Sequence, residues 1–175
     1  LENDRENYNK LFKVFGTNIK FGIYNNYGMD KEKLQDLLMF TSSKTNELVT
    51  LKEYVENMKK DQKDIYYASG ETIEKIDSLP QIEQVKEKDY EILYLTDYVD
   101  EFTLNALGEY SGKKFKNVSA ADLDLEEDKE EIDKINEENK DMFTLMRETI
   151  GVSEVRFTKK LKTHPVCLTS KGNIS

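Results

Sequence analysis

The sequence is poor in several residue types that carry specialised chemistry. Its 175 residues include one cysteine, one histidine, two prolines and no tryptophan. The single cysteine, Cys167, excludes a disulfide framework and a multi-cysteine metal site, and it is typical of a reducing compartment. No apolar run approaches the roughly 18 residues that a membrane-spanning helix needs. The first residues also lack a basic segment followed by an apolar one, so we expect neither a signal peptide nor a transmembrane segment.

The charge of the chain is negative and unevenly distributed. Acidic residues outnumber basic ones by 35 to 26, and we expect no nucleic-acid partner because such binding needs a basic face. Residues 122–141 hold eleven acids against three lysines, which favours a solvated helix start or a linker over a metal site or a site for a basic partner. A calcium loop fits poorly, because Glu127 replaces the turn glycine and Asp133 the closing glutamate.

The first sixty residues predict a helical coil. Apolar residues three and four apart over residues 8–15 predict a helix that ends at Gly16. A second helix is predicted after Asp30, with a stripe of leucines. A third is predicted after Thr50, where Glu53 completes a capping box.

Residues 61–123 predict a small α/β/α sandwich. β-favouring runs at 64–70 and 90–97 are separated by a helical pattern that Pro80 interrupts. A further helix should end at Gly108, before a weak third strand near Phe115. Strands joined by helical crossovers indicate a short parallel sheet with helices on both faces, so the fold class is α/β.

Residues 124–175 predict an acidic linker and helix followed by a truncated α+β tail. The pattern over residues 132–150 predicts one long helix that Gly151 ends. Alternation over 152–161 predicts a strand, and 165–168 could form another. These elements have no later partner in the sequence, which suggests a truncated domain.

Catalytic motifs are scarce. His164 and Cys167 are three apart, and in an extended segment their side chains point to opposite faces, which argues against a nucleophilic pair. The segment from Gly108 to Lys113 has three residues between its glycines instead of four, and Lys114 follows instead of serine or threonine. We interpret it as a helix end and a turn, not as a phosphate-binding loop.

The best candidate site is a surface for binding polypeptide. Glu101, Phe102 and Asn105 lie within one turn of a predicted helix. An exposed aromatic ring beside a carboxylate and an amide suits contact with other proteins. The alternative is that Phe102 belongs to the core, and the sequence alone leaves both interpretations open.

Several long stretches of the chain closely resemble the 90-kDa heat-shock-protein chaperone family. The likeness runs in order from about Tyr8 to Leu125 and resumes after the acidic block. It is carried by residues 18–24 (NIKFGIY), 41–72 (with QKDIYYASGE), 90–102 (YEILYLTDYVDEF), 112–115 (GKKF) and 154–170 (EVRFTKKLKTHPVCLTS).

The resemblance implies a segment of a cytoplasmic, homodimeric, ATP-driven chaperone. It implies the later part of the middle domain over residues 1–123 and the start of the C-terminal domain beyond. Unfolded or partly folded client proteins would be the partners, with Glu101, Phe102 and Asn105 as client-binding residues. ATP and magnesium would bind elsewhere in the full-length protein, so we expect no cofactor and no ATP hydrolysis in this segment. Two other hypotheses are a flavodoxin-like nucleotide-binding enzyme and a free-standing interaction module.

Overall fold

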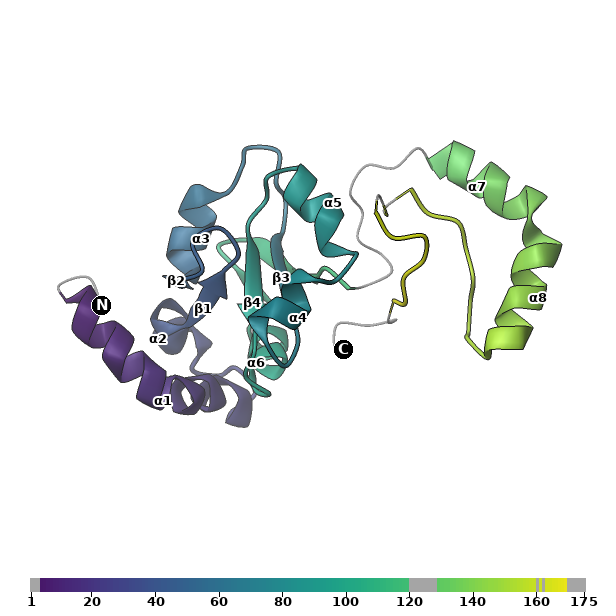
Figure 1. Ribbon diagram of the computed structural model, residues 1–175. Coiled ribbons are helices and arrows are strands. Elements are labelled where there is room, and N and C mark those ends of the chain that lie inside the picture. Colours follow the sequence, from purple (N-terminus) through teal and green to yellow (C-terminus); the bar gives the residue numbers. More distant parts are fainter. Residues whose placement is uncertain (1–3, 120–128, 160, 162, 170–175) are drawn as a thin grey trace.

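The computed structural model describes residues 4–119, 129–159, 161 and 163–169 (Figure 1). No helix in this part of the chain is both long enough and apolar enough to cross a membrane. The elements, in chain order, are α1 (Arg5–Asn25), α2 (Lys31–Leu34), the 3-10 helix η1 (Gln35–Leu37), β1 (Met39–Ser42), β2 (Leu48–Thr50), α3 (Leu51–Asn57), β3 (Ile65–Ser69), α4 (Ile73–Asp77), α5 (Ile82–Glu87), β4 (Ile92–Leu95), α6 (Asp100–Leu107), β5 (Glu109–Tyr110), β6 (Lys113–Asn117), α7 (Lys129–Glu138) and α8 (Lys140–Ile150).

One mixed sheet organises the fold, with strand order β2-β1-β4-β3-β6-β5. Its centre is parallel: β3 pairs with β4 on one side and with β6 on the other. The short parallel sheet predicted from the sequence is therefore confirmed. The outer strands are antiparallel, because β1 pairs with both β2 and β4, and β5 forms a hairpin with β6.

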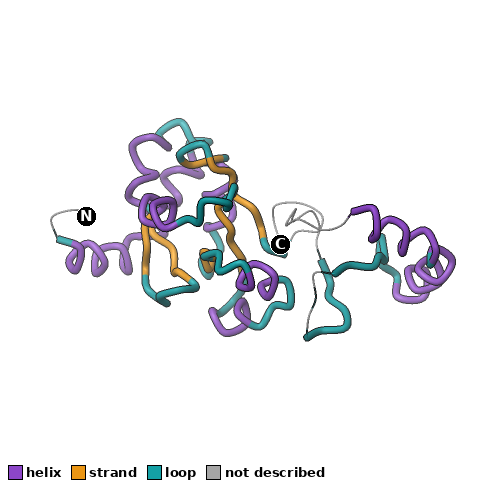
Figure 2. Tube along the Cα trace, turned by 90° about the horizontal axis from the view of Figure 1, so that it is seen from above, coloured by secondary structure: helices purple, strands orange, loops and turns teal. Residues whose placement is uncertain are grey.

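Helices cover both faces of this sheet, as Figure 2 shows from above. Alternate strand residues enter two separate hydrophobic clusters, as the two-residue period of a strand requires. On β3, Tyr67 joins a cluster with residues of α1, α3 and α6, whereas Tyr66 and Ala68 join a cluster with residues of α4 and α5. This arrangement confirms the three-layer α/β/α sandwich.

Helix α1 is longer than the sequence pattern predicted. It continues through Gly16 to Asn25, so the predicted end at Gly16 is wrong. Gly16 instead lies on the buried face with Phe12, Lys20 and Ile23, and an added Cβ would lie 2.7 Å from the Phe12 ring. Here glycine permits close packing within a helix and does not end it.

The prediction that the first sixty residues form a helical coil is wrong for residues 39–50. Residues 39–50 form the β1–β2 hairpin, and Leu38 and Phe40 are buried against the central sheet. The second predicted helix is correspondingly reduced to α2 and η1. Because β1 pairs with β4, the division placed at residue 60 runs through one sheet and one core. A short apolar run such as residues 37–40 does not by itself distinguish a helix from a buried strand.

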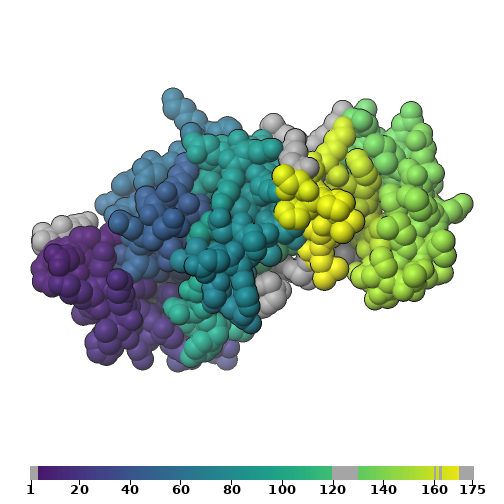
Figure 3. All heavy atoms as spheres, viewed as in Figure 1, coloured from purple at the N-terminus to yellow at the C-terminus, as the bar shows by residue number. Residues whose placement is uncertain are grey.

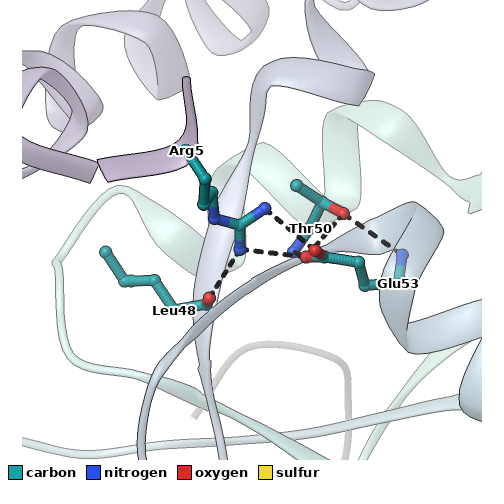
Figure 4. A network of polar contacts seen from close by, with 4 residues as sticks. All are labelled: Arg5, Leu48, Thr50 and Glu53. Atoms are coloured by element: carbon teal, nitrogen blue, oxygen red, sulfur yellow. Dashed lines mark hydrogen bonds and ion pairs between the residues drawn. The ribbon is translucent and has the colours of Figure 1, made fainter. Parts of the chain in front are cut away.

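The predicted capping box at the start of α3 is confirmed. Thr50 Oγ1 accepts a hydrogen bond from the Glu53 amide at 3.1 Å, and Glu53 Oε2 accepts one from the Thr50 amide at 2.7 Å. Arg5, at the start of α1, donates to both oxygens of Glu53 and to the carbonyl of Leu48 (Figure 4). The same carboxylate thus caps α3 and holds the first turn of α1 against the hairpin.

The tail differs from its prediction in two ways. The predicted long helix is interrupted at Asn139 into α7 and α8, and Gly151 ends α8 as expected. Residues 152–159, 161 and 163–169 contain no strand, so the strands predicted there are wrong. A strand needs a partner edge, and none pairs with this segment in the described part of the chain. The acidic stretch over 122–128, with most of the rejected calcium loop, lies outside the described residues.

Side-chain contacts hold part of the tail against α5. The amide of Thr163 donates to Glu83 Oε2 at 3.3 Å, and His164 Nδ1 lies 3.2 Å from Glu83 Oε1. Gln81 donates to the carbonyl of Leu168 at 2.6 Å. In Figure 3 the yellow tail accordingly lies against the teal part of the chain that includes α5.

Candidate functional site

A buried ion pair joins α1 to the start of α6. Lys20 is only 4% exposed, and its Nζ lies 2.8 Å from Asp97 Oδ2 and 2.5 Å from Asp100 Oδ1. The ammonium group also lies over the rings of Phe12 and Phe40, 5.6 and 5.1 Å from their centroids. A buried lysine requires such partners, because an unpaired charge in the core is strongly destabilising.

The protonation of Asp100 reflects the same burial. Loss of water around the carboxyl raises its pKa, while the adjacent Lys20 charge acts in the opposite direction. Removal of one partner would leave the other charge uncompensated. Thr103, one turn further along α6, adds a hydrogen bond to the backbone carbonyl of Lys20 at 3.3 Å. These contacts set the position of α6 relative to α1.

The three predicted site residues on α6 do not face the same way. Glu101 points inward: it is 9% exposed, and its Oε1 accepts hydrogen bonds from Ser69 at 2.6 Å and from Asn117 at 3.4 Å. The carboxylate therefore joins α6 to the carboxyl ends of β3 and β6. Burial, together with the charge of Glu101, raises the pKa of Tyr67 to about 12. Phe102 and Asn105 are both exposed.

Phe102 belongs to a group of rings at the edge of the α1–α6 contact. Its side chain is 39% exposed, and its ring centroid lies 5.3 Å from that of Tyr24 on α1. Phe21 lies 6.4 Å from Tyr24 and 5.7 Å from Tyr98, the latter edge-on. We call Phe21, Tyr24, Tyr98 and Phe102 the aromatic cluster.

The aromatic cluster was only partly accessible to sequence reasoning. Phe21 and Tyr24 are one helical turn apart, a spacing that would have indicated a shared face. The prediction that the first helix ends at Gly16 concealed this. Tyr98 precedes α6 in a loop, and no periodic pattern predicts which way a loop side chain points.

The flavodoxin-like hypothesis requires a phosphate-binding loop after β3, and the geometry there does not support one. The amide of Gly70 donates to the carbonyl of Leu95 at 3.1 Å, so it is already occupied by the sheet. An added Cβ at Gly70 would lie 2.8 Å from Ile76, so glycine is required for packing of α4. Glu71, which follows, forms an ion pair with Lys75 and brings negative charge to the place where phosphate would bind.

The segment after α6 agrees with its interpretation as a helix end and a turn. Gly108 ends α6 with a positive φ, and Ser111 and Gly112 form the turn between β5 and β6. Among the residues that the structure describes, no group of three histidine, cysteine or acidic side chains could hold a metal ion.

Comparison with known proteins identifies the family. The sequence profile described as "Hsp90 protein" matches residues 1–174. The chain is 56% identical to Chaperone protein HtpG of Clostridium acetobutylicum and 52% identical to that of Oceanobacillus iheyensis, matching 99% and 100% of this chain and 28% of each relative. The chain therefore belongs to the Hsp90 family, and it spans about 28% of the length of these curated relatives.

A solved structure supports the same assignment at the level of the fold. The middle domain of a Plasmodium falciparum heat shock protein superposes with a TM-score of 0.63 and 32% sequence identity, over 69% of this chain and 50% of that one. The α/β/α sandwich described above is thus the fold of an Hsp90 middle domain.

Proposed function

We propose that this chain is the client-contacting segment of an ATP-dependent chaperone. In the full-length protein it would bind unfolded or partly folded proteins and transmit movements that nucleotide binding drives in another domain. The observation that carries the proposal is the position of Phe102, an exposed aromatic side chain at the contact between α1 and α6. Exposed aromatic residues on a fixed support are the usual anchors of protein–protein contacts.

The three α6 residues would have different roles in this binding. Phe102 would supply apolar contact area, and Asn105 would offer an amide donor and acceptor to the backbone of the client. Glu101 would act from within, because its hydrogen bonds to Ser69 and Asn117 hold α6 on the sheet. It is thus a positioning residue in this proposal and not a contact residue.

The joint between α1 and α6 would also serve transmission. The Lys20 ion pairs and the Thr103 hydrogen bond connect the first helix of the chain to the helix that carries Phe102. A movement of α1 would therefore carry α6 with it. Homodimer formation, ATP hydrolysis and a cytoplasmic location belong to the proposal for the full-length protein, because the chain spans 28% of its relatives.

Replacement of Phe102 by alanine tests the proposal. We expect F102A to bind a permanently unfolded client, such as reduced and carboxymethylated α-lactalbumin, at least about fivefold more weakly, since loss of an anchor costs more than about 1 kcal/mol. Fluorescence anisotropy of the labelled client measures the dissociation constant. Urea unfolding of the same variant checks that it retains a cooperative transition.

Phe15 provides a matched control on a different side of α1. It is 55% exposed on α1, six residues before Phe21 and hence rotated well away from it around the helix. F15A removes the same side chain and should leave client affinity within twofold. If F102A binds the client as tightly as the unmodified chain does, Phe102 is not part of the site and the proposal is wrong.

A further inference from the structure

We infer that client binding extends beyond α6 onto α1 and the loop before α6, and that the full aromatic cluster accepts uncharged, apolar segments of extended polypeptide. This inference rests on the proposed function and specifies the partner and the remainder of its site. It starts from the ring contacts, which link Phe102 through Tyr24 and Phe21 to Tyr98 in one continuous series.

The exposed part of this series lies mostly outside α6. Tyr98 is 74% exposed and Tyr24 is 41% exposed, against 39% for Phe102. The two tyrosines are therefore at least as exposed as the α6 residue. An exposed group of aromatic rings of this kind marks an interaction surface.

The charge around the cluster defines the occupant. Most of the chain's net charge of −9 lies in residues 122–141, and the four rings are neutral. The acidic groups beside the rings have partners: the half-exposed Asp97 binds Lys20, and the buried Glu101 accepts hydrogen bonds from Ser69 and Asn117. A neutral apolar surface of this kind is complementary to neutral apolar segments and does not attract a basic peptide.

The polar groups at the margin of the cluster suit an extended backbone. Asn105 lies one turn after Phe102 on α6 and is exposed. Its amide can donate and accept hydrogen bonds at the same time, as an unpaired peptide group requires. The tyrosine hydroxyls add further groups of the same kind. Recognition would then depend on apolar side chains and free backbone, with little dependence on sequence.

The test measures binding of a fluorescein-labelled, uncharged peptide whose leucine and phenylalanine residues alternate with serine and glycine. We expect Y98A and Y24A to weaken binding by the 175-residue chain at least about fivefold, as for an aromatic anchor, and Y98F to retain the affinity because it keeps the ring. F15A is the matched control and should stay within twofold. Raising NaCl from about 50 to 500 mM should change the affinity less than twofold, because no charge pair is involved.

The outcomes separate this inference from the proposed function. If F102A weakens binding while Y98A and Y24A do not, the extension onto α1 is wrong and the α6 site stands. If F102A also has no effect, the proposed function fails as well. Equal weakening by F15A would show nonspecific adhesion to exposed rings. A steep loss of affinity with salt, or tighter binding of a lysine-containing version of the peptide, would contradict the inference that the bound segment is uncharged.

Discussion

Glu91 shows how one buried acid couples folding to pH. Glu91 is only 6% exposed, and its Oε1 accepts a hydrogen bond from the Ser42 hydroxyl. The backbone carbonyl of Glu91 accepts a hydrogen bond from the Tyr54 hydroxyl at 2.6 Å. Burial raises the pKa of the Glu91 carboxyl above its ordinary value of 4.5, and the Ser42 hydrogen bond only partly offsets this.

The sign of the resulting pH dependence is definite. Since the folded state binds this proton more tightly than the unfolded state, the contribution of Glu91 to the unfolding free energy falls as pH rises from about 4.5 through the folded pKa. E91Q removes this ionisation and can still accept from Ser42. We therefore expect E91Q to gain stability relative to the unmodified chain as pH rises from 4 to 7, measured by urea unfolding at several pH values.

Glu56 supplies the control for this measurement. It is an exposed glutamate on α3, and E56Q changes the net charge by the same amount. The stability difference between E56Q and the unmodified chain should vary less over the same pH range. A difference for E91Q that stays constant from pH 4 to 7 would show that the Glu91 proton is not linked to folding.

At the scale of elements, short helices depend on contacts at their ends. Helix α3 has seven residues, too few to be stable alone in water. The Thr50–Glu53 capping box satisfies its first amides, and Arg5 holds the same glutamate from α1 (Figure 4). The start of α3 is thus also the place where α1 is attached to the β1–β2 hairpin.

Loss of this cap should be measurable in isolation. We expect T50A to lower the unfolding free energy by about 1 kcal/mol, because an amide at the start of α3 loses its acceptor. T50S keeps the hydroxyl and should retain most of the stability. Chemical denaturation gives both values. Equal destabilisation by serine and alanine would indicate that the threonine methyl group matters here and the cap does not.

At the scale of the whole molecule, the chain has the fold of a middle domain and no recognisable nucleotide site in its described residues. The position after β3, where an α/β protein could bind phosphate, is filled by Gly70 packing on Ile76 and by the acid Glu71. Under the proposed function, this chain would contribute binding and a connection between elements, and nucleotide chemistry would lie elsewhere in the full-length protein.

Calorimetric titration with ATP and magnesium tests this division of labour. We expect no saturable heat for the 175-residue chain, because the Gly70 amide after β3 is already bonded to Leu95 and Glu71 brings negative charge to the place where phosphate would bind. The same nucleotide solution titrated into adenylate kinase checks the measurement. Micromolar binding would favour the nucleotide-binding enzyme hypothesis over a client-contacting segment.

Features with a local cause were predictable from the sequence. The Thr50 cap, the helix break at Pro80 and the helix end at Gly108 each follow from the chemistry of one or two residues, and the structure confirms all three. The strands β3 and β4 were predictable from continuous β-favouring runs. Gly16 was misinterpreted because its role depends on the Phe12 ring, not on its own conformational preference.

The sequence by itself determined the family, the parallel strands at the centre of the sheet and the residues of α6 that merit attention. Only the tertiary structure decided that Glu101 turns inward while Phe102 stays exposed, and that Phe102 meets rings from α1 and from the loop before α6. The physical reason is sequence distance. Phe21 and Tyr98 meet because Lys20 pairs with Asp97 and Asp100, and periodicity within one helix carries no information about such contacts between distant residues.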